Sequence, residues 1–168
     1  MTHVLLINPP WGKQKGSIWY KVASCLPSLG LGYIAATLEQ NNIQVEILDC
    51  QAITYSLDEI LSKIESFQPE YIGFTATTVL IQNVLEISES IKLRWPEKKI
   101  VLGGVHPTIA TEEVLTNPFV DIVVRGEGEF TFLDVVKNKP MKEVLGISYK
   151  SNGNIRHNLD RPLIEDIN

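Results

Sequence analysis

The 168-residue sequence is poor in three features that often point to a function. It has only two cysteines, Cys25 and Cys50, too few and too far apart to suggest a metal cluster. Its 15 Lys and Arg residues against 20 Asp and Glu give a net charge of −5, without the basic surplus of nucleic-acid-binding proteins. No apolar run approaches the ~20 residues that span a bilayer. We therefore expect no nucleic-acid or membrane partner, and a reducing, cytoplasmic location with free thiols.

Strand and helix signals alternate along the chain. Short apolar runs predict five strands, and apolar residues at helical spacing predict helices between them. The strands are expected at 3–7, 45–49, 71–75, 99–102 and 121–124, and the helices near 29–40, 56–67, 80–93, 112–115 and 130–137. This alternation predicts an α/β domain whose five-stranded parallel sheet is doubly wound, in the flavodoxin-like (Rossmann-like) order 2-1-3-4-5.

The end of the sequence follows a different pattern. Residues 146–150 and 154–157 are strand-like and flank Ser151-Asn152-Gly153, which predicts a C-terminal β-hairpin. The segment beginning at Arg161-Pro162 has no predicted element after it and is typical of a linker. We therefore divide the chain into an α/β domain at 1–140, a hairpin extension at 141–158 and a linker at 159–168.

Two predicted strands end in glycines. The fourth is followed by Gly103-Gly104-Val105-His106-Pro107-Thr108, and the fifth by Arg125-Gly126-Glu127-Gly128-Glu129. Ligands of open parallel sheets bind at the carboxyl ends of the strands, and glycine lacks the Cβ that would hold a flat ligand away from the backbone. The pattern predicts a glycine-lined ligand site at this edge. Glu127 either accepts a hydrogen bond from that ligand or belongs to a salt-bridged turn that caps the next helix.

Other segments reach the same edge. For the threonine hydroxyls of Thr75-Ala76-Thr77-Thr78 we expect one of two roles, or both: binding ligand amides or a phosphate, and capping the helix that follows. His106 has no second ligand at metal spacing, so we expect it to contact a ligand or to orient the residues around one, and we expect no metal site. The long segment after the first strand carries three aromatic residues, Trp11, Trp19 and Tyr20. We expect them to cover a ligand, to contact another domain or to pack on the sheet.

Three common ligand sites of α/β domains do not fit. Gly30-Leu31-Gly32-Tyr33-Ile34-Ala35 matches the dinucleotide pattern G-x-G-x-x-G/A, with Asp49 later in the chain, but begins about twenty residues beyond the tight turn where that motif belongs. A phosphorylated receiver domain needs acidic residues where this chain has Asn8-Pro9-Pro10, and an Asp where it has Thr75-Ala76-Thr77. A flavin site would want a Ser/Thr-rich phosphate loop in place of residues 8–13.

Five segments, taken in order, carry a family resemblance. They are Asn8-Pro9-Pro10, residues 27–36 followed by Asp49, Gly73-Phe74-Thr75, and the two glycine segments after the fourth and fifth predicted strands. Together they resemble the amino-terminal cobalamin-binding domain of B12-dependent radical SAM enzymes, over about residues 3–166. The resemblance implies these cofactor-binding residues: Asn8, Pro9, Pro10, Leu29, Gly30, Gly32, Asp49, Thr75, Ala76, Thr77, Thr78, Gly103, Gly104, His106, Pro107, Thr108, Arg125, Gly126, Glu127 and Gly128.

The resemblance also implies how cobalamin would be held. Cobalamin domains of the methionine synthase type carry D-x-H-x-x-G after the first strand, and its histidine ligates cobalt. Here Asn8-Pro9-Pro10-Trp11-Gly12 stands in that place, which implies cobalamin bound base-off without a histidine lower ligand. The nucleotide tail would then run along Gly103, Gly104 and Gly126, and the corrin would lie over the strand ends with residues 75–80 beneath cobalt.

The expected parent protein is a radical SAM methyltransferase, or alternatively a cyclase of the tetrapyrrole type. The family's C-x-x-x-C-x-x-C run, which holds a [4Fe–4S] cluster that cleaves S-adenosylmethionine, is missing from this sequence. The cluster and S-adenosylmethionine would therefore belong to a following radical SAM domain, and this chain would bind cobalamin without catalysing a reaction. The alternative is a cofactor-free, flavodoxin-like interaction module that binds a partner through its aromatic loop.

Overall fold

A computed structural model describes residues 2–11, 28–53 and 55–164. The strands are β1 (His3–Asn8), β2 (Gln44–Asp49), β3 (Tyr71–Thr75), β4 (Lys99–Gly103), β5 (Ile122–Val124), β6 (Ile147–Ser151) and β7 (Asn154–His157). The helices are α2 (Leu29–Gln40), α3 (Leu57–Phe67), α4 (Ile81–Arg94), α5 (Val105–Ile109), α6 (Thr111–Thr116), α7 (Glu129–Val136) and the 3-10 turn η1 (Met141–Glu143). The predictions for Trp19, Tyr20 and Cys25 lie outside the described residues.

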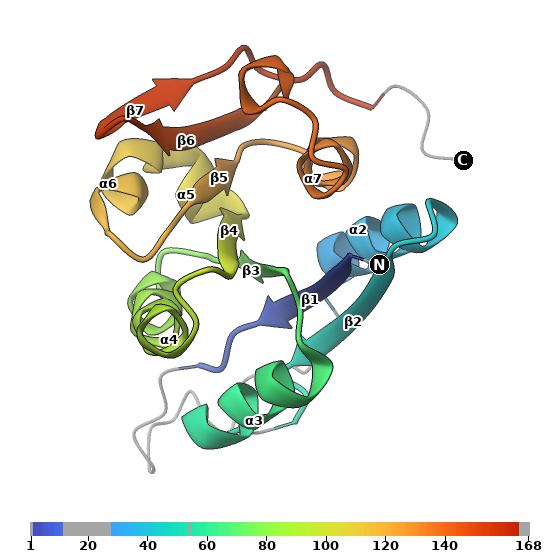
Figure 1. The fold of residues 1–168 in the computed structure, drawn as a ribbon, viewed down its shortest axis with the longest axis vertical. Coiled ribbons are helices and arrows are strands. Elements are labelled where there is room, and N and C mark those ends of the chain that lie inside the picture. The colour runs from blue at the N-terminus through green and yellow to red at the C-terminus, as the bar shows by residue number, and fades with distance from the viewer. Residues whose placement is uncertain (1, 12–27, 54, 165–168) are drawn as a thin grey trace.

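The sheet confirms the predicted strand order and extends it (Figure 1). Strands β2-β1-β3-β4-β5 are parallel, and their register brings Asn8 beside Asp49 and Thr75 beside Gly103. The predicted hairpin forms and continues the same sheet, because β6 pairs antiparallel with β5 and β7 pairs with β6. The hairpin segment also contributes fully buried side chains, Val144 and Ile147, to the core.

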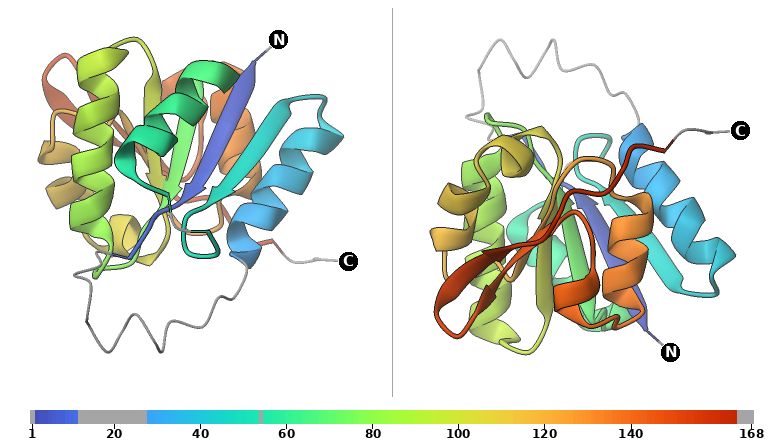
Figure 2. Two further views of the ribbon diagram at one scale, coloured as in Figure 1. Left: turned by 90° about the horizontal axis from the view of Figure 1, so that it is seen from below. Right: turned by 90° about the horizontal axis from the view of Figure 1, so that it is seen from above.

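Helices cover both faces of the sheet, as expected for a doubly wound domain (Figure 2). Along β1, Leu5 and Ile7 pack with α3, α4 and α6, whereas Val4 and Leu6 pack with α2 and α7. Successive side chains of a strand point to opposite faces, so a run without polar residues is what a strand buried on both sides requires. Each fully buried aliphatic side chain contributes about 1.5–3 kcal/mol to folding.

The segment after β4 differs from the prediction. We expected a loop through His106, Pro107 and Thr108, but these residues form the helix α5. Gly104 has φ +97°, which turns the chain from the strand into the helix. Pro107 lies in the first turn, where its missing N–H removes no intrahelical hydrogen bond. The helix therefore begins directly after two glycines and has a proline in its first turn, although these residue types more often interrupt a helix.

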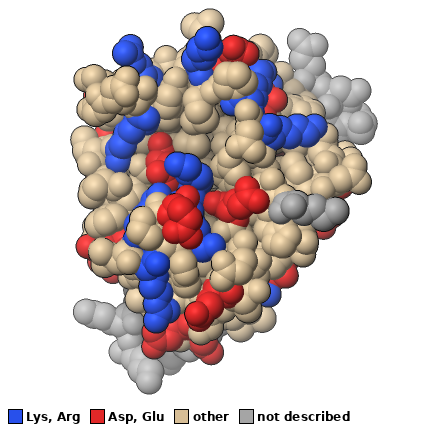
Figure 3. Space-filling view, in the orientation of Figure 1, with Lys and Arg blue, Asp and Glu red and all other residues tan. Residues whose placement is uncertain are grey.

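Charged side chains are spread over the surface. On the face in Figure 3, basic and acidic residues are intermixed and separated by uncharged ones. Within the described residues, no helix has the length and apolar character needed to cross a membrane.

Candidate functional site

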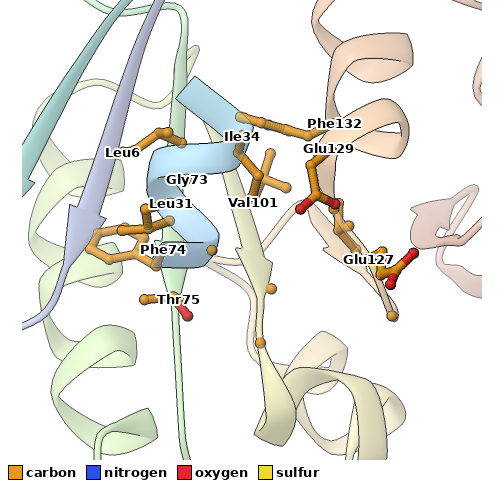
Figure 4. Close-up of a pocket in the computed structure, with 16 residues that line it drawn as sticks. Leu6, Leu31, Ile34, Gly73, Phe74, Thr75, Val101, Glu127, Glu129 and Phe132 are labelled. Atoms are coloured by element: carbon orange, nitrogen blue, oxygen red, sulfur yellow. The ribbon is translucent and has the colours of Figure 1, made fainter. Parts of the chain in front are cut away.

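A pocket of about 270 Å³ opens at the carboxyl edge of the parallel strands. It lies between the sheet, the start of α2 and the start of α7 (Figure 4). Its walls are mainly aliphatic and aromatic, and glycines line its strand-end side. The lining residues are Leu6, Gly30, Leu31, Ile34, Gly73, Phe74, Thr75, Val101, Gly103, Gly104, Val124, Gly126, Glu127, Gly128, Glu129 and Phe132.

The structure brings only part of the predicted residue set into this pocket. Seven predicted site residues line it: Gly30, Thr75, Gly103, Gly104, Gly126, Glu127 and Gly128. The others lie outside its lining: Asn8, Pro9, Pro10, Leu29, Gly32, Asp49, Ala76, Thr77, Thr78, His106, Pro107, Thr108 and Arg125. Sequence reasoning missed the apolar wall and Glu129. Gly73 could have indicated the position of the pocket, since a glycine inside a strand often marks a place where a ligand or another backbone approaches closely.

Thr108 connects the two glycine segments. Its hydroxyl donates to the carbonyl of Gly104 (2.9 Å) and accepts from the N–H of Gly126 (3.3 Å). Gly104 is confined on its other side, because a Cβ there would lie 2.9 Å from the Ala76 carbonyl oxygen and 2.9 Å from Thr75 Oγ1. Glycine at 104 is therefore required by the backbone, and Thr108 supports the pocket rim without lining it.

His106 is tied to the loop that follows β3. Its backbone N–H donates to the Ala76 carbonyl (3.1 Å), and its Nδ1 hydrogen-bonds Thr78 Oγ1 (3.2 Å). The ring is buried, with Nε2 unpartnered in the described part of the chain. The capping role considered for the threonine run is wrong, because α4 has Leu80 as its N-cap and no side-chain hydrogen bond there. His106 instead holds the loop whose threonines reach the strand edge.

Asn8 and Asp49 form a network at the carboxyl ends of β1 and β2. Asn8 donates to Asp49 Oδ1 (2.8 Å) and accepts from the Gln51 side chain (3.1 Å), while Asp49 also accepts the Gln51 backbone N–H (3.0 Å). Burial, with a smaller contribution from Asp49, raises the pKa of the Cys50 thiol to about 12. Cys50 therefore stays protonated at neutral pH and is a poor nucleophile or metal ligand.

Arg125 and Glu127 are already engaged by the chain itself. The Arg125 guanidinium donates to the carbonyls of Ile147 (2.8 Å) and Asn158 (2.6 Å) and pairs with Asp160 (2.7 Å). The Glu127 carboxylate accepts the backbone N–H of Ile164 at 2.6 Å. These contacts hold the hairpin and the segment after it against the glycine-containing loop between β5 and α7. The expected salt-bridged cap is wrong, because no described side chain caps α7 and the ion pair of this motif joins Arg125 to Asp160 beyond the hairpin. The ligand contact of Glu127 stays a prediction.

The described residues gather no group of three or more His, Cys, Asp or Glu side chains that could hold a metal ion. What they present is an apolar slot beside glycines at the ligand-binding edge of a flavodoxin-like sheet. Such a slot suits a flat, largely apolar group that approaches the backbone closely.

Comparison with known proteins identifies the class of this domain. Residues 18–136 match the B12 binding domain family, and the chain belongs to that family. An uncharacterized methyltransferase of Pyrococcus horikoshii is 34% identical over 169 residues, covering 98% of this chain and 36% of that protein. An anaerobic magnesium-protoporphyrin IX monomethyl ester cyclase of Synechocystis is 29% identical over 171 residues, covering 98% and 34%. The chain thus spans about a third of the length of these relatives.

A solved structure shares the fold. The cobalamin-dependent S-adenosylmethionine radical enzyme OxsB, solved with aqua-cobalamin and S-adenosylmethionine bound, superposes with a TM-score of 0.81 at 22% identity. The match covers 97% of this chain and 23% of OxsB. The B12-binding fold that the sequence motifs predicted is confirmed.

Proposed function

We propose that this chain is the cobalamin-binding module of a radical SAM enzyme and that the pocket takes the nucleotide tail of cobalamin. The observation that carries the proposal is the apolar slot at the strand edge. A Cβ at Gly30 or Gly126 would meet no atom of another described segment within 4 Å, so the described part of the chain leaves the space beside these glycines open to a ligand. The slot is lined by Leu31, Phe74 and Phe132 among others, which suits an aromatic base.

We further propose that cobalamin binds base-off, without a histidine on cobalt. The sequence has three histidines. His3 is the first residue of β1 and hydrogen-bonds the Phe67 carbonyl, and His157 lies on β7 and hydrogen-bonds Ser148. His106 lies near the strand edge, but its ring is buried and bonded to Thr78. The unpartnered Nε2 of His106 is buried, so no histidine presents an exposed ring nitrogen to a ligand above the strand ends. Asn8 is bonded to Asp49 where other cobalamin domains have the D-x-H-x-x-G motif.

In this arrangement the corrin lies over the carboxyl ends of the strands. Three exposed apolar side chains surround that edge, Val79 after β3 and Val105 and Ile109 on α5. Exposed apolar groups that gather at one edge favour contact with a ligand or another domain. The backbone after β3, held by His106, forms the floor beneath the corrin in this proposal.

For the whole protein we propose methyl transfer, with cyclisation as the alternative. The relative from Pyrococcus horikoshii is named a methyltransferase, which supports methyl transfer, and the relative from Synechocystis is named a cyclase, which supports the alternative. Bound cobalamin supplies methyl-carrier chemistry, while a following radical SAM domain would hold the [4Fe–4S] cluster and S-adenosylmethionine. This chain's own part is to bind and orient the cofactor.

The first experiment is a titration of the purified chain with hydroxocobalamin, followed by removal of free ligand and a visible spectrum. We expect retained cobalamin with a base-off spectrum. A spectrum typical of a histidine ligand would overturn the proposed lower face while keeping the module. If the chain retains no corrinoid, the interaction-module alternative replaces the proposal.

A further inference from the structure

Glu129 brings a carboxylate to the edge of a mainly apolar slot. It is the first residue of α7 and lines the pocket, and in Figure 4 its carboxyl lies on the pocket side, between α7 and β4. Its Oε2 atom is buried and has no hydrogen-bond partner in the described part of the chain. A buried carboxylate oxygen without a donor is costly, so such atoms usually mark a missing partner.

The described residues around the slot do not supply that partner. Among the described residues that line the pocket there is no Lys, Arg or His. Glu127, the other acid of the lining, accepts the Ile164 N–H, and its carboxyl points away from the pocket in Figure 4. The start of α7 favours an acidic side chain in the first turn, but it gives Oε2 no hydrogen-bond donor. The donor is therefore expected on the ligand.

The chemistry of the nucleotide tail narrows the choice of donor. The phosphate of the tail is anionic and would be repelled. The free ring nitrogen of a dimethylbenzimidazole base that has left cobalt is an acceptor at neutral pH, so it offers the carboxylate nothing. The sugar hydroxyls are donors, and a hydroxyl hydrogen bond to a carboxylate is among the stronger ones.

We infer that Glu129 accepts a hydrogen bond from a sugar hydroxyl of the nucleotide tail, and so makes this site selective for corrinoids that carry the tail. This inference rests on the proposed function, but adds a residue that sequence reasoning did not select. The apolar wall holds the base through contact alone, whereas Glu129 fixes the sugar at the rim and sets how the tail enters.

The test compares two corrinoids, hydroxocobalamin and diaquocobinamide, which lacks the nucleotide tail. Both are titrated into the wild-type chain and into Glu129→Leu and Glu129→Gln, at neutral pH. Loss of a hydrogen bond to a charged group predicts roughly ten- to hundredfold weaker cobalamin binding for Glu129→Leu. Glu129→Gln keeps a carbonyl acceptor and should lose less. Cobinamide affinity should stay the same in all three proteins.

Two controls separate binding from folding. Glu113→Leu removes a first-turn glutamate from α6, away from the pocket lining, and should bind both corrinoids as the wild type does. Thermal unfolding without ligand reports any general loss of stability. A variant that is only less stable would lower affinity for both corrinoids together.

Each outcome decides one of the two proposals. If wild type and Glu129→Leu bind cobalamin equally well, or if both corrinoids weaken in parallel, the role of Glu129 is overturned and the cobalamin module stands. A second outcome is a cobalamin affinity that rises as pH falls, but only when Glu129 is present. This result would show that Glu129 contacts the protonated base, and it would overturn the assignment to a sugar hydroxyl. If the wild-type chain binds neither corrinoid, the proposed function fails, and the inference with it.

Discussion

At the scale of single residues, the glycines of the pocket have two different physical roles. Gly104 adopts φ +97°, and an added Cβ would meet the Ala76 carbonyl and Thr75 Oγ1. A substitution there would disturb the backbone whether or not a ligand binds, so it cannot test the site. Gly30 has open space where its Cβ would be. Gly30 is therefore the position where a side chain can fill the slot and leave the fold intact.

We predict that Gly30→Leu abolishes or weakens cobalamin binding at least tenfold while the chain stays folded. The leucine would project from the first turn of α2 into space that the proposed tail needs, and replacing glycine in a helix improves helix propensity by up to about 1 kcal/mol. Equilibrium binding of hydroxocobalamin and a denaturant titration measure the two effects separately.

Ala36→Leu is the matched control, because Ala36 lies on the exposed side of the same helix. It should bind cobalamin as the wild-type chain does. Unchanged cobalamin binding by Gly30→Leu would mean that the tail lies elsewhere.

At the scale of elements, α3 shows how local chemistry fixes a boundary. The Ser56 hydroxyl accepts the Glu59 backbone N–H (3.3 Å), and the Glu59 carboxylate accepts the Ser56 N–H (2.7 Å) and hydroxyl (2.8 Å). This is the capping box expected from the sequence. Both partners lie within four residues, so no tertiary contact is needed to position them.

We predict that Ser56→Ala lowers the free energy of unfolding by about 1 kcal/mol at pH 7. The backbone N–H of Ser56, and then its hydroxyl, hold the pKa of Glu59 below its usual value. A lowered folded-state pKa stabilises the protein above the unfolded-state pKa, and this contribution disappears as pH falls through the folded-state pKa. The loss of stability between neutral and acidic pH should therefore be smaller in Ser56→Ala.

Urea unfolding at pH 7 and in the acidic range measures both parts of this prediction. Equal stability of the two chains at pH 7 would show that the Ser56 hydroxyl contributes nothing to the fold.

Helix α5 shows the opposite case. His106, Pro107 and Thr108 have no helical periodicity, and a segment with Gly-Gly followed by proline is typical of a loop. The helix forms because Gly104 turns the chain and because Thr108 and His106 find partners at Gly126 and Thr78. These partners are distant in the sequence, so no local pattern could predict the helix or the joining of the two glycine segments.

At the scale of the whole molecule, the hairpin belongs to the main sheet. Strand β6 covers the edge of β5, and Arg125 fixes both the hairpin and the segment beyond it through Ile147, Asn158 and Asp160. A chain that ended at residue 140 would therefore leave strand β5 without its neighbour β6. The division at residue 140 remains a prediction, and the contacts of the hairpin argue against an independent domain there.

We predict that a chain of residues 1–140 aggregates or forms oligomers, whereas a chain of residues 1–164 is a folded species of one size. Removing β6 exposes the unpaired backbone of β5, and exposed edge strands pair with other chains. Size-exclusion chromatography and circular dichroism of the two chains measure this difference. A soluble, cooperatively folding 1–140 chain would instead establish the shorter segment as a domain.

The sequence by itself determined the alternation of strands and helices, the parallel order and the glycine-lined edge, because burial on two faces and sharp turns depend on residue types close together in the chain. The tertiary structure decided which side chains remain free for a ligand. Arg125, Glu127 and Asn8 have residue types suited to ligand binding, yet the fold engages them with Asp160, Ile164 and Asp49. Glu129 differs from Glu127 only in position, and its partners are decided by packing between α7 and the sheet.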